Sequence, residues 1–339
     1  MGQSPSSILQ ELLDEELGGE PTTVSGLTNH LPMALVAKER LGADPEELIR
    51  FAAAYSTRLA PIHESENRLD EKSWRSAIGQ SGAAADLRSY FVRLMDEVGP
   101  DEALRTHLPA LLPGVGGAAF HGVIRLSYAI EVSSPSRIAA GLAYLAEVGS
   151  PLGPLVPGQV TTQDPLEVLA DLSKSSDWPE PPPKKTIDEE IRIIAKNELF
   201  SGVVSSLEIV DDTETRLAEA ALQVYASSND FTALHGVTGL AAIFSIRPWI
   251  EDDVLVSRFA FQALVAAYLS IGAPPLWSPD RLDQFVDSNE SDPKDVRAAA
   301  AFSDDEHVSK LVYTAHRSWE RTGNPLYLAV AARKAPLTS

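Results

Sequence analysis

Hydrophobic residues recur every three to four positions along most of the chain, a spacing that places apolar side chains on one face of an α-helix. The strict alternation that is typical of half-buried strands is nearly absent. The helical pattern covers Ile8–Leu17, Pro32–Arg40, Pro45–Leu59, Asp86–Val98, Ala118–Ile130, Pro135–Val148, Thr186–Phe200, Thr213–Ala226, Phe231–Phe244, Val254–Ile271, Pro293–Phe302 and Asp304–Arg321. We therefore predict an all-α fold, a multi-helix bundle.

Several of these segments begin with residues that favour a helix start. Proline occupies the first helical position after Asp44 and after Ser134, where its missing N–H is no loss to the helix. Ser303 is followed three residues later by Glu306, which is a capping-box pattern. This pattern predicts that His307 lies about one turn inside its helix.

The chain is expected to fold as one main unit. We predict a helical N-terminal extension over residues 1–28 and a single helical domain over residues 29–339. The segment Ser175–Lys185 contains three consecutive prolines, which exclude helix and favour extended geometry. This segment is either a linker between two helical halves or a stiff surface loop.

The charge balance and the amino-acid usage exclude several classes of protein. Lys and Arg number 28 against 48 Asp and Glu, a net charge of −20, which disfavours binding to nucleic acid or to anionic membranes. No cysteine is present, so disulfides, thiolate metal sites and cysteine nucleophiles are excluded, which fits a cytoplasmic protein. The pattern shows neither a signal peptide nor an apolar run of membrane-spanning length.

Four of the seven histidines, His30, His121, His235 and His307, share one local context: each lies in or near the first turns of an apolar helix. A neutral imidazole is a good ligand for iron, zinc, copper or nickel. Histidines from four helices can surround one point in a bundle core. Each histidine alone is more often a hydrogen-bonded core residue, but the repetition favours a shared metal site.

The other three histidines are set aside for separate reasons. His63 lies in a charged run and is expected to be exposed. His107 precedes a proline-containing segment that we interpret as a loop, and a structural role is expected. His316 is nine residues after His307, on the opposite side of the helix, so the two cannot face one site.

Lys310 is a candidate fifth ligand, three residues after His307 on nearly the same face. A lysine ammonium has no lone pair, but burial lowers the pKa, and the neutral amine can add carbon dioxide to form a carbamate. The carbamate would supply an anionic ligand beside four neutral ones. The alternative is a surface lysine that pairs with Glu306 or Asp305.

Arg125 and Tyr128 are the candidate catalytic residues, because they follow His121 by four and seven positions on the same helix face. Either can position an anionic oxygen or a phenolic substrate. Either can equally be an ordinary core residue.

The run Gly114–Ala119 matches a dinucleotide-binding pattern only superficially. No strand precedes it, because Leu108–Pro113 contains two prolines, so the βαβ context is missing. We interpret the run as a loop that opens the His121 helix. A nicotinamide cofactor such as NADPH is therefore not supported by the residues.

Five blocks of this sequence resemble the questin oxidase family, in the family's order, between about residues 29 and 333. They are Asn29–Met33, Trp74–Tyr90, Leu108–Leu111 running into His121–Arg125, Leu234–Thr238, and His307 with Lys310 and Leu311. The resemblance implies ring-opening oxygenation of anthraquinones and related aromatic polyketides in secondary metabolism. It also implies either Baeyer–Villiger-like chemistry with NADPH or a non-haem iron site with histidines and a modified lysine. The residues favour the iron site.

Our hypothesis is thus a mononuclear Fe(II) oxygenase in which the four histidines, with carboxylated Lys310, hold the metal and O2 is the co-substrate. An apolar pocket would accept a flat aromatic polycycle, lined by residues such as Met33, Phe120, Tyr128, Phe231, Phe244 and Tyr313. Three alternatives remain: an NADPH-dependent Baeyer–Villiger-type monooxygenase, a metal-dependent hydrolase or isomerase, and a non-catalytic helical scaffold.

Overall fold

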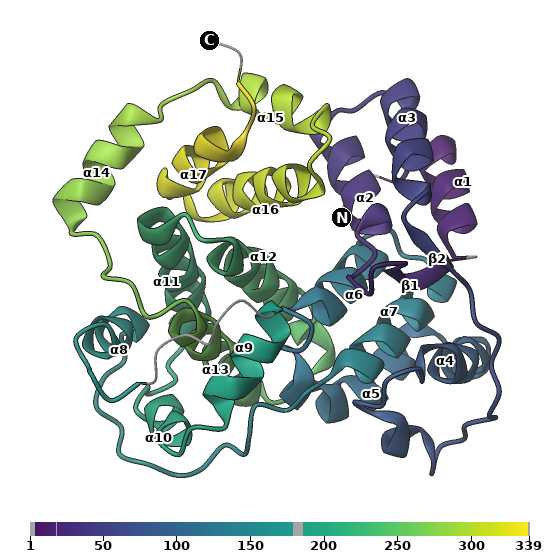
Figure 1. The fold of residues 1–339 in the computed structure, drawn as a ribbon, viewed down its shortest axis with the longest axis horizontal. Helices are drawn as coiled ribbons and strands as arrows, with labels where there is room; N and C mark the ends of the chain where they lie inside the picture. The colour runs from purple at the N-terminus through teal and green to yellow at the C-terminus, as the bar shows by residue number, and fades with distance from the viewer. Residues whose placement is uncertain (1–3, 18, 179–185, 338–339) are drawn as a thin grey trace.

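A computed structural model describes residues 4–17, 19–178 and 186–337. These residues form seventeen α-helices, three short 3-10 helices and a sheet of two strands (Figure 1). The prediction of an all-α bundle is confirmed.

Among the described residues, the first half of the chain contains eight α-helices and two 3-10 helices. Their bounds are α1 (Ser7–Glu16), α2 (Leu31–Leu41), α3 (Pro45–Ser56), α4 (Ala84–Val98), α5 (Pro100–Leu111), α6 (His121–Glu131), α7 (Pro135–Val148) and α8 (Pro165–Leu172). The 3-10 helices here are η1 (Trp74–Ala77) and η2 (Leu112–Gly114).

The second half is also helical. Its elements are α9 (Ile187–Ala195), α10 (Phe200–Ser205), α11 (Thr213–Ser228), α12 (Phe231–Ser245), η3 (Arg247–Trp249), α13 (Asp253–Ser270), α14 (Pro279–Ser288), α15 (Pro293–Ala301), α16 (Glu306–Thr322) and α17 (Leu326–Lys334).

The N-terminal segment differs from the expected helical extension. After α1, the strand β1 (Gly19–Thr23) pairs antiparallel with β2 (Leu59–Pro61), and α1 packs on α2 and α3. In the predicted linker, residues 175–178 are not helical, whereas residues 179–185 lie outside the described part of the chain.

Two local predictions about helices were wrong. The first part of the proline-containing segment expected to be a loop belongs to helix α5, which ends at Leu111, two residues after Pro109. Pro109 removes one helical hydrogen bond, and the helix continues for only two residues beyond it. The segment predicted as one helix over 186–200 is two helices, α9 and α10. Between them Asn197 accepts a hydrogen bond from the Leu199 backbone N–H, at 2.9 Å, which competes with helical bonding.

Four helices pack in a closed ring: α2 contacts α6 and α16, and α12 contacts the same two helices. Each carries one of the four candidate histidines at or near its N-terminal end. The ring therefore brings together parts of the chain as distant as residues 30 and 307.

Helix α13 packs on α12, which belongs to this ring, and on α9. It is long and apolar enough to cross a membrane by length and composition alone, and 72% of it is buried inside the fold. The burial is that of a core helix.

Candidate metal centre

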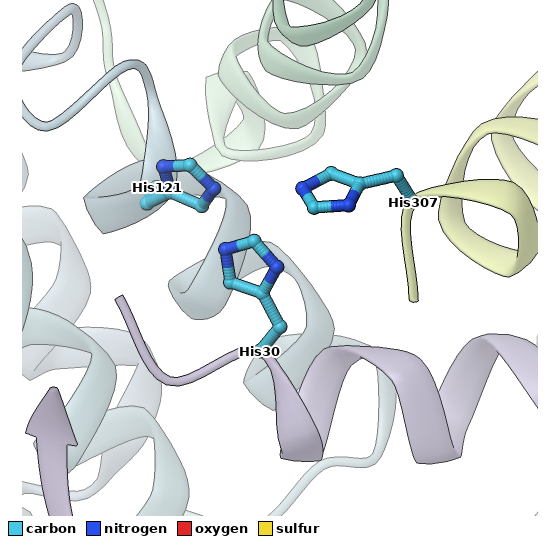
Figure 2. A group of neighbouring side chains, drawn as sticks. All are labelled: His30, His121 and His307. Atoms are coloured by element: carbon cyan, nitrogen blue, oxygen red, sulfur yellow. The ribbon is translucent and has the colours of Figure 1, made fainter. Parts of the chain in front are cut away.

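The four candidate histidines meet at one point. His30 is the N-cap residue of α2, His121 the first residue of α6, His235 the fifth of α12 and His307 the second of α16. Ring centroids are 4.5 Å apart for His30 and His121, and 4.7 Å for His30 and His307. Figure 2 shows the rings of His30, His121 and His307 turned toward one another.

Three of the rings already have the spacing of a ligand set. One nitrogen from each of His30, His121 and His307 lies within 4.8 Å of the others. Two nitrogens on opposite sides of a metal at about 2.1 Å are about 4.2 Å apart, so a small inward shift would suffice. The ring of His235 lies beside them, 4.8 Å from that of His121 and 5.3 Å from that of His307.

Each of three rings directs its Nδ1 to an oxygen acceptor. His121 Nδ1 lies 2.5 Å from the Ala118 carbonyl and His235 Nδ1 lies 2.8 Å from the Phe231 carbonyl. His307 Nδ1 lies 3.0 Å from Asp305 Oδ1. An N–H at Nδ1 places the free lone pair on Nε2, which is how outer partners orient metal-binding histidines.

The opposite nitrogens of two of these rings are buried without a partner. Neither His121 Nε2 nor His235 Nε2 has a hydrogen bond among the described residues. A buried polar atom left unbonded costs about 1–3 kcal/mol, so it calls for an explanation. Two buried lone pairs on neighbouring rings, whose centroids are 4.8 Å apart, fit a bound metal ion.

His30 is the one ring with two competing partners at Nδ1. Glu306 Oε1 lies 3.4 Å away and Lys310 Nζ lies 3.3 Å away. Donation to Glu306 leaves Nε2 free for a metal, whereas acceptance from Lys310 puts the proton on Nε2. A cation at the site favours the first arrangement, because it repels the ammonium and needs the lone pair.

Burial keeps all four imidazoles neutral. It lowers the pKa of His235 to about 3 and lowers those of His30 and His121 well below the usual value, with further lowering from neighbouring charged groups. The pKa of His307 is also lowered, chiefly by burial, although Asp305 acts in the opposite direction. Neutral rings are the form that binds metal.

The loop before His121 is held in an uncommon conformation. Ala118, Ala119 and Phe120 have φ values of 47°, 54° and 66°, in the left-handed region that favours glycine. Each such residue costs about 1–3 kcal/mol and persists only where its surroundings hold it. Here Asp188 accepts the Ala118 N–H at 2.7 Å.

Helix α12 also shapes this loop. A Cβ on Gly239 would lie 2.4 Å from the Phe120 ring, so only glycine allows that ring to pack there. Gly239 is one turn after His235 on α12, and Phe120 directly precedes His121. The glycine thus links the positions of two of the four rings.

The start of α16 differs from the prediction. The N-cap is Asp305, whose carboxylate accepts the His307 backbone N–H at 2.8 Å, and no Ser303 capping box forms. His307 is therefore the second helical residue and not one turn inside. The same carboxylate bonds its ring, so the cap and the ring orientation share one side chain.

Lys310 is buried, with 2% of its surface exposed, so the alternative of a surface lysine is wrong. Burial lowers the pKa of its amine to about 8, against the opposing charges of Glu306 and Asp305. Its nitrogen contacts His30, so it lies at the edge of the histidine cluster.

The two candidate catalytic residues have their described contacts away from the four rings. Arg125 is buried, donates to Glu16 Oε1 at 2.6 Å and donates to the Asn29 carbonyl at 3.3 Å. Asn29 in turn donates to the same Glu16 oxygen at 2.8 Å. Arg125 thus holds the segment that leads into His30, and its catalytic role stays a prediction.

Tyr128 lies two turns along α6 from His121. Its ring is 6.1 Å from that of Tyr313, and burial raises its pKa well above the usual value. A hydroxyl held protonated in this way can donate but does not act as a base near neutral pH. Its catalytic role also stays a prediction.

The remaining histidines lie outside the cluster. The His63 side chain is 78% exposed, and His107 is buried with Nε2 at 2.9 Å from the Tyr90 hydroxyl. His316 lies beside Glu320, with 3.4 Å between Nδ1 and Oε1.

Phe231 is the expected pocket residue that contacts the cluster. Its ring centroid is 4.7 Å from those of both His235 and His307, and half of the residue is exposed. Met33 and Phe120 are fully buried core residues. Phe231 is thus an aromatic ring that is both half-exposed and in contact with the cluster.

The sequence reasoning missed the groups that orient the rings. Asp305 and Glu306 immediately precede His307, and only the fold shows that one faces its own neighbour and the other faces His30. Their adjacency to a candidate ligand was the one available signal. The acceptors at Ala118 and Phe231 are backbone carbonyls, which every residue has, so the sequence does not indicate them.

Comparison with known proteins bears on what this cluster does. A family model described as Questin oxidase-like matches residues 27–315 of the 339. The match includes all four histidines and Lys310. No curated protein matches the chain.

Proposed function

The chain belongs to the Questin oxidase-like family, and on that premise we propose that it is a non-haem iron-dependent oxygenase that acts on an anthraquinone-like aromatic polyketide. The family implies an oxidoreductase and suggests a small-molecule substrate and O2. The proposal adds the metal, its ligands and the shape of the substrate.

One observation carries the proposal: buried, neutral imidazoles share one space, and two of them have unbonded Nε2 atoms. We propose His30, His121, His235 and His307 as the ligands. Nitrogen ligands of this kind suit iron, and they suit zinc as well, so the ligand set alone does not select the metal. The oxidative chemistry of the family favours iron.

Charge balance calls for an anion at the same place. Four neutral ligands leave a divalent ion uncompensated, and the positive N-terminal ends of α2, α6 and α16 point toward it. We propose that the neutral amine of Lys310 adds carbon dioxide, forming an N–C bond and releasing a proton. The carbamate would then lie at the edge of the cluster, because the Lys310 nitrogen is 3.3 Å from His30 Nδ1.

When bound, Fe(II) supplies the activation of O2 and the orientation of an electron-rich phenolate substrate. The chain's own residues keep the rings neutral by burial, and they orient three of the rings by hydrogen bonds from Nδ1 to oxygen acceptors. The exposed Phe231 ring offers a flat apolar face on which an aromatic polycycle stacks.

The test begins with the metal content of protein purified without chelator. We expect about one iron per chain, loss of most of it in His121→Ala, and retention in His316→Ala, a histidine on α16 outside the cluster. We also expect O2 uptake with an anthraquinone-type substrate, with a higher KM in Phe231→Ala. Absence of stoichiometric metal refutes the proposal.

Two other results would assign a different chemistry. Stoichiometric zinc without O2 uptake would indicate a hydrolase or isomerase in which the metal acts as a Lewis acid. Turnover by metal-free protein that depends on NADPH would indicate the Baeyer–Villiger-type alternative.

A further inference from the structure

A polar cleft lies at the far end of the helices that carry the histidines. Its volume is about 510 Å³, and residues near the C-terminal ends of α2, α6 and α12 line it together with α15 and the second half of α16. Arg40 lies ten positions after His30 along α2, a rise of about 15 Å. The cleft is therefore separate from the histidine cluster.

Arginine side chains gather at the cleft of this acidic protein. Three arginines line it, Arg40, Arg297 and Arg317, against two carboxylates, Glu131 and Glu320. The whole chain has a net charge of −20. Glu39, which does not line the cleft, also pairs with Arg40, so Arg297 is the lining arginine without a carboxylate partner in the described structure.

The carboxylate of Glu131 is already fully bonded. It accepts from Arg40 Nε at 3.0 Å, from Arg317 Nη1 at 3.0 Å and from the Tyr313 hydroxyl at 2.5 Å. The Glu320 side chain is 59% exposed and lies next to His316, so water and salt screen its charge. Neither carboxylate compensates the remaining arginine donors.

Two of the arginines retain donors without an anionic partner. The Arg40 side chain is only 8% exposed; its Nη1 contacts Glu39, and its Nη2 has no hydrogen bond among the described residues. Arg297 donates to the Arg40 carbonyl at 3.0 Å and forms no ion pair with a carboxylate in the described part of the chain. Arg40 Nη2 is enclosed by the protein, so the half-buried Arg297 is the arginine whose charge an anion in the cleft would compensate.

We propose that this cleft binds a small anion through a carboxylate or phosphate group held by Arg297 and Arg317. Planar guanidinium groups match such oxyanions with paired hydrogen bonds. The hydroxyls of Ser127 and Ser245, 2.8 Å apart, line the same cleft and offer further polar contacts. The site does not depend on the metal or on the proposed reaction.

The proposal is tested by calorimetric titration of the full chain with pyrophosphate and, separately, with citrate, at constant ionic strength. We expect saturable binding that is weakened at least about tenfold by Arg297→Gln and by Arg317→Gln. The matched control, Lys174→Gln, removes one positive charge from a lysine that is 74% exposed and lies outside the cleft, and should bind as the wild type does. Tighter binding of one probe assigns a phosphate or a carboxylate ligand.

No saturable binding of either probe overturns the proposal, and so does equal weakening in the control. Arg317 is 60% exposed, so Arg317→Gln should fold even if Arg297→Gln does not, and the melting curve of each variant checks this. The metal content of both cleft variants should equal that of the wild type, which separates this test from that of the proposed function.

Discussion

The substitution Asp305→Asn isolates the effect of one carboxylate on the metal centre. Asp305 Oδ1 accepts two hydrogen bonds from His307, one from the backbone N–H at 2.8 Å and one from ring Nδ1 at 3.0 Å. Asparagine caps a helix about as well as aspartate does. The helix start should therefore survive, while the charged partner of the ring is lost.

We expect the affinity for the metal to fall about tenfold. Removal of a carboxylate behind a histidine ligand typically weakens metal binding about 10–100-fold, or about 1.4–2.7 kcal/mol. The Asp305 side chain is 45% exposed, so solvent screening places the effect near the lower limit. The mechanism is a less basic, less firmly oriented imidazole.

The same contact makes the stability of the metal-free protein depend on pH. The hydrogen bonds from His307 hold the pKa of Asp305 well below its usual value. A carboxyl group whose pKa is lower in the folded state stabilises the fold above its unfolded pKa, and the contribution is lost as the pH falls through the folded value. The stability difference between wild type and Asp305→Asn should thus be full at pH 7 and should shrink below about pH 4.

Competition with a chromophoric chelator measures the affinity change. The matched control is Asp304→Asn, since Asp304 is 81% exposed, bonds Arg50 and contacts none of the four rings in the described structure. If Asp305→Asn binds metal as tightly as the wild type, or if the control loses as much affinity, the reasoning about the ring partner is refuted.

Three further predictions concern the same architecture. Removing the metal with a chelator should lower the melting temperature, since a ligand at 100 times its Kd adds about 2.7 kcal/mol; an unchanged melting curve would contradict a metal bound to the folded state. Gly239→Ala should lower the free energy of unfolding in urea by about 1–3 kcal/mol and weaken metal binding, because the added Cβ would clash with Phe120. The control Gly236→Ala, with open space around the added Cβ, should leave the stability unchanged. Arg125→Leu should lower the free energy of unfolding by about 3–5 kcal/mol, because the buried carboxylate of Glu16 loses its cationic partner. An unchanged free energy of unfolding in urea would contradict this.

The local pattern of the sequence was sufficient for most of the fold. The prolines after Asp44 and Ser134 correctly predicted where α3 and α7 start, because proline at the first helical position loses no hydrogen bond. The apolar period, set by 3.6 residues per turn, correctly predicted the extent of α7, whereas α3 ends at Ser56 and Leu59 begins strand β2. The segments predicted to be helical do not include α5, α8, α14 and α17, and the pattern also failed where a single side chain decided the outcome. Pro109 was tolerated near a helix end, and Asn197 interrupted a segment that looked continuous.

The sequence by itself determined which residues could form the site. Four histidines, each at the start of an apolar helix, were a small candidate set, and helix periodicity placed His316 on another face. Lys310 entered the set by its spacing from His307. All of these inferences use neighbours within a few turns.

Only the tertiary structure decided that the four helix starts face one point, and it alone assigned the partners of each ring. Helices α2 and α16 meet although their residues are nearly 280 positions apart, and the contact of Lys310 with His30 depends on that packing. Packing likewise buried Lys310 and turned Arg125 toward Glu16. Helix periodicity records which face of each helix is apolar, and it contains no information about which other helix that face will meet.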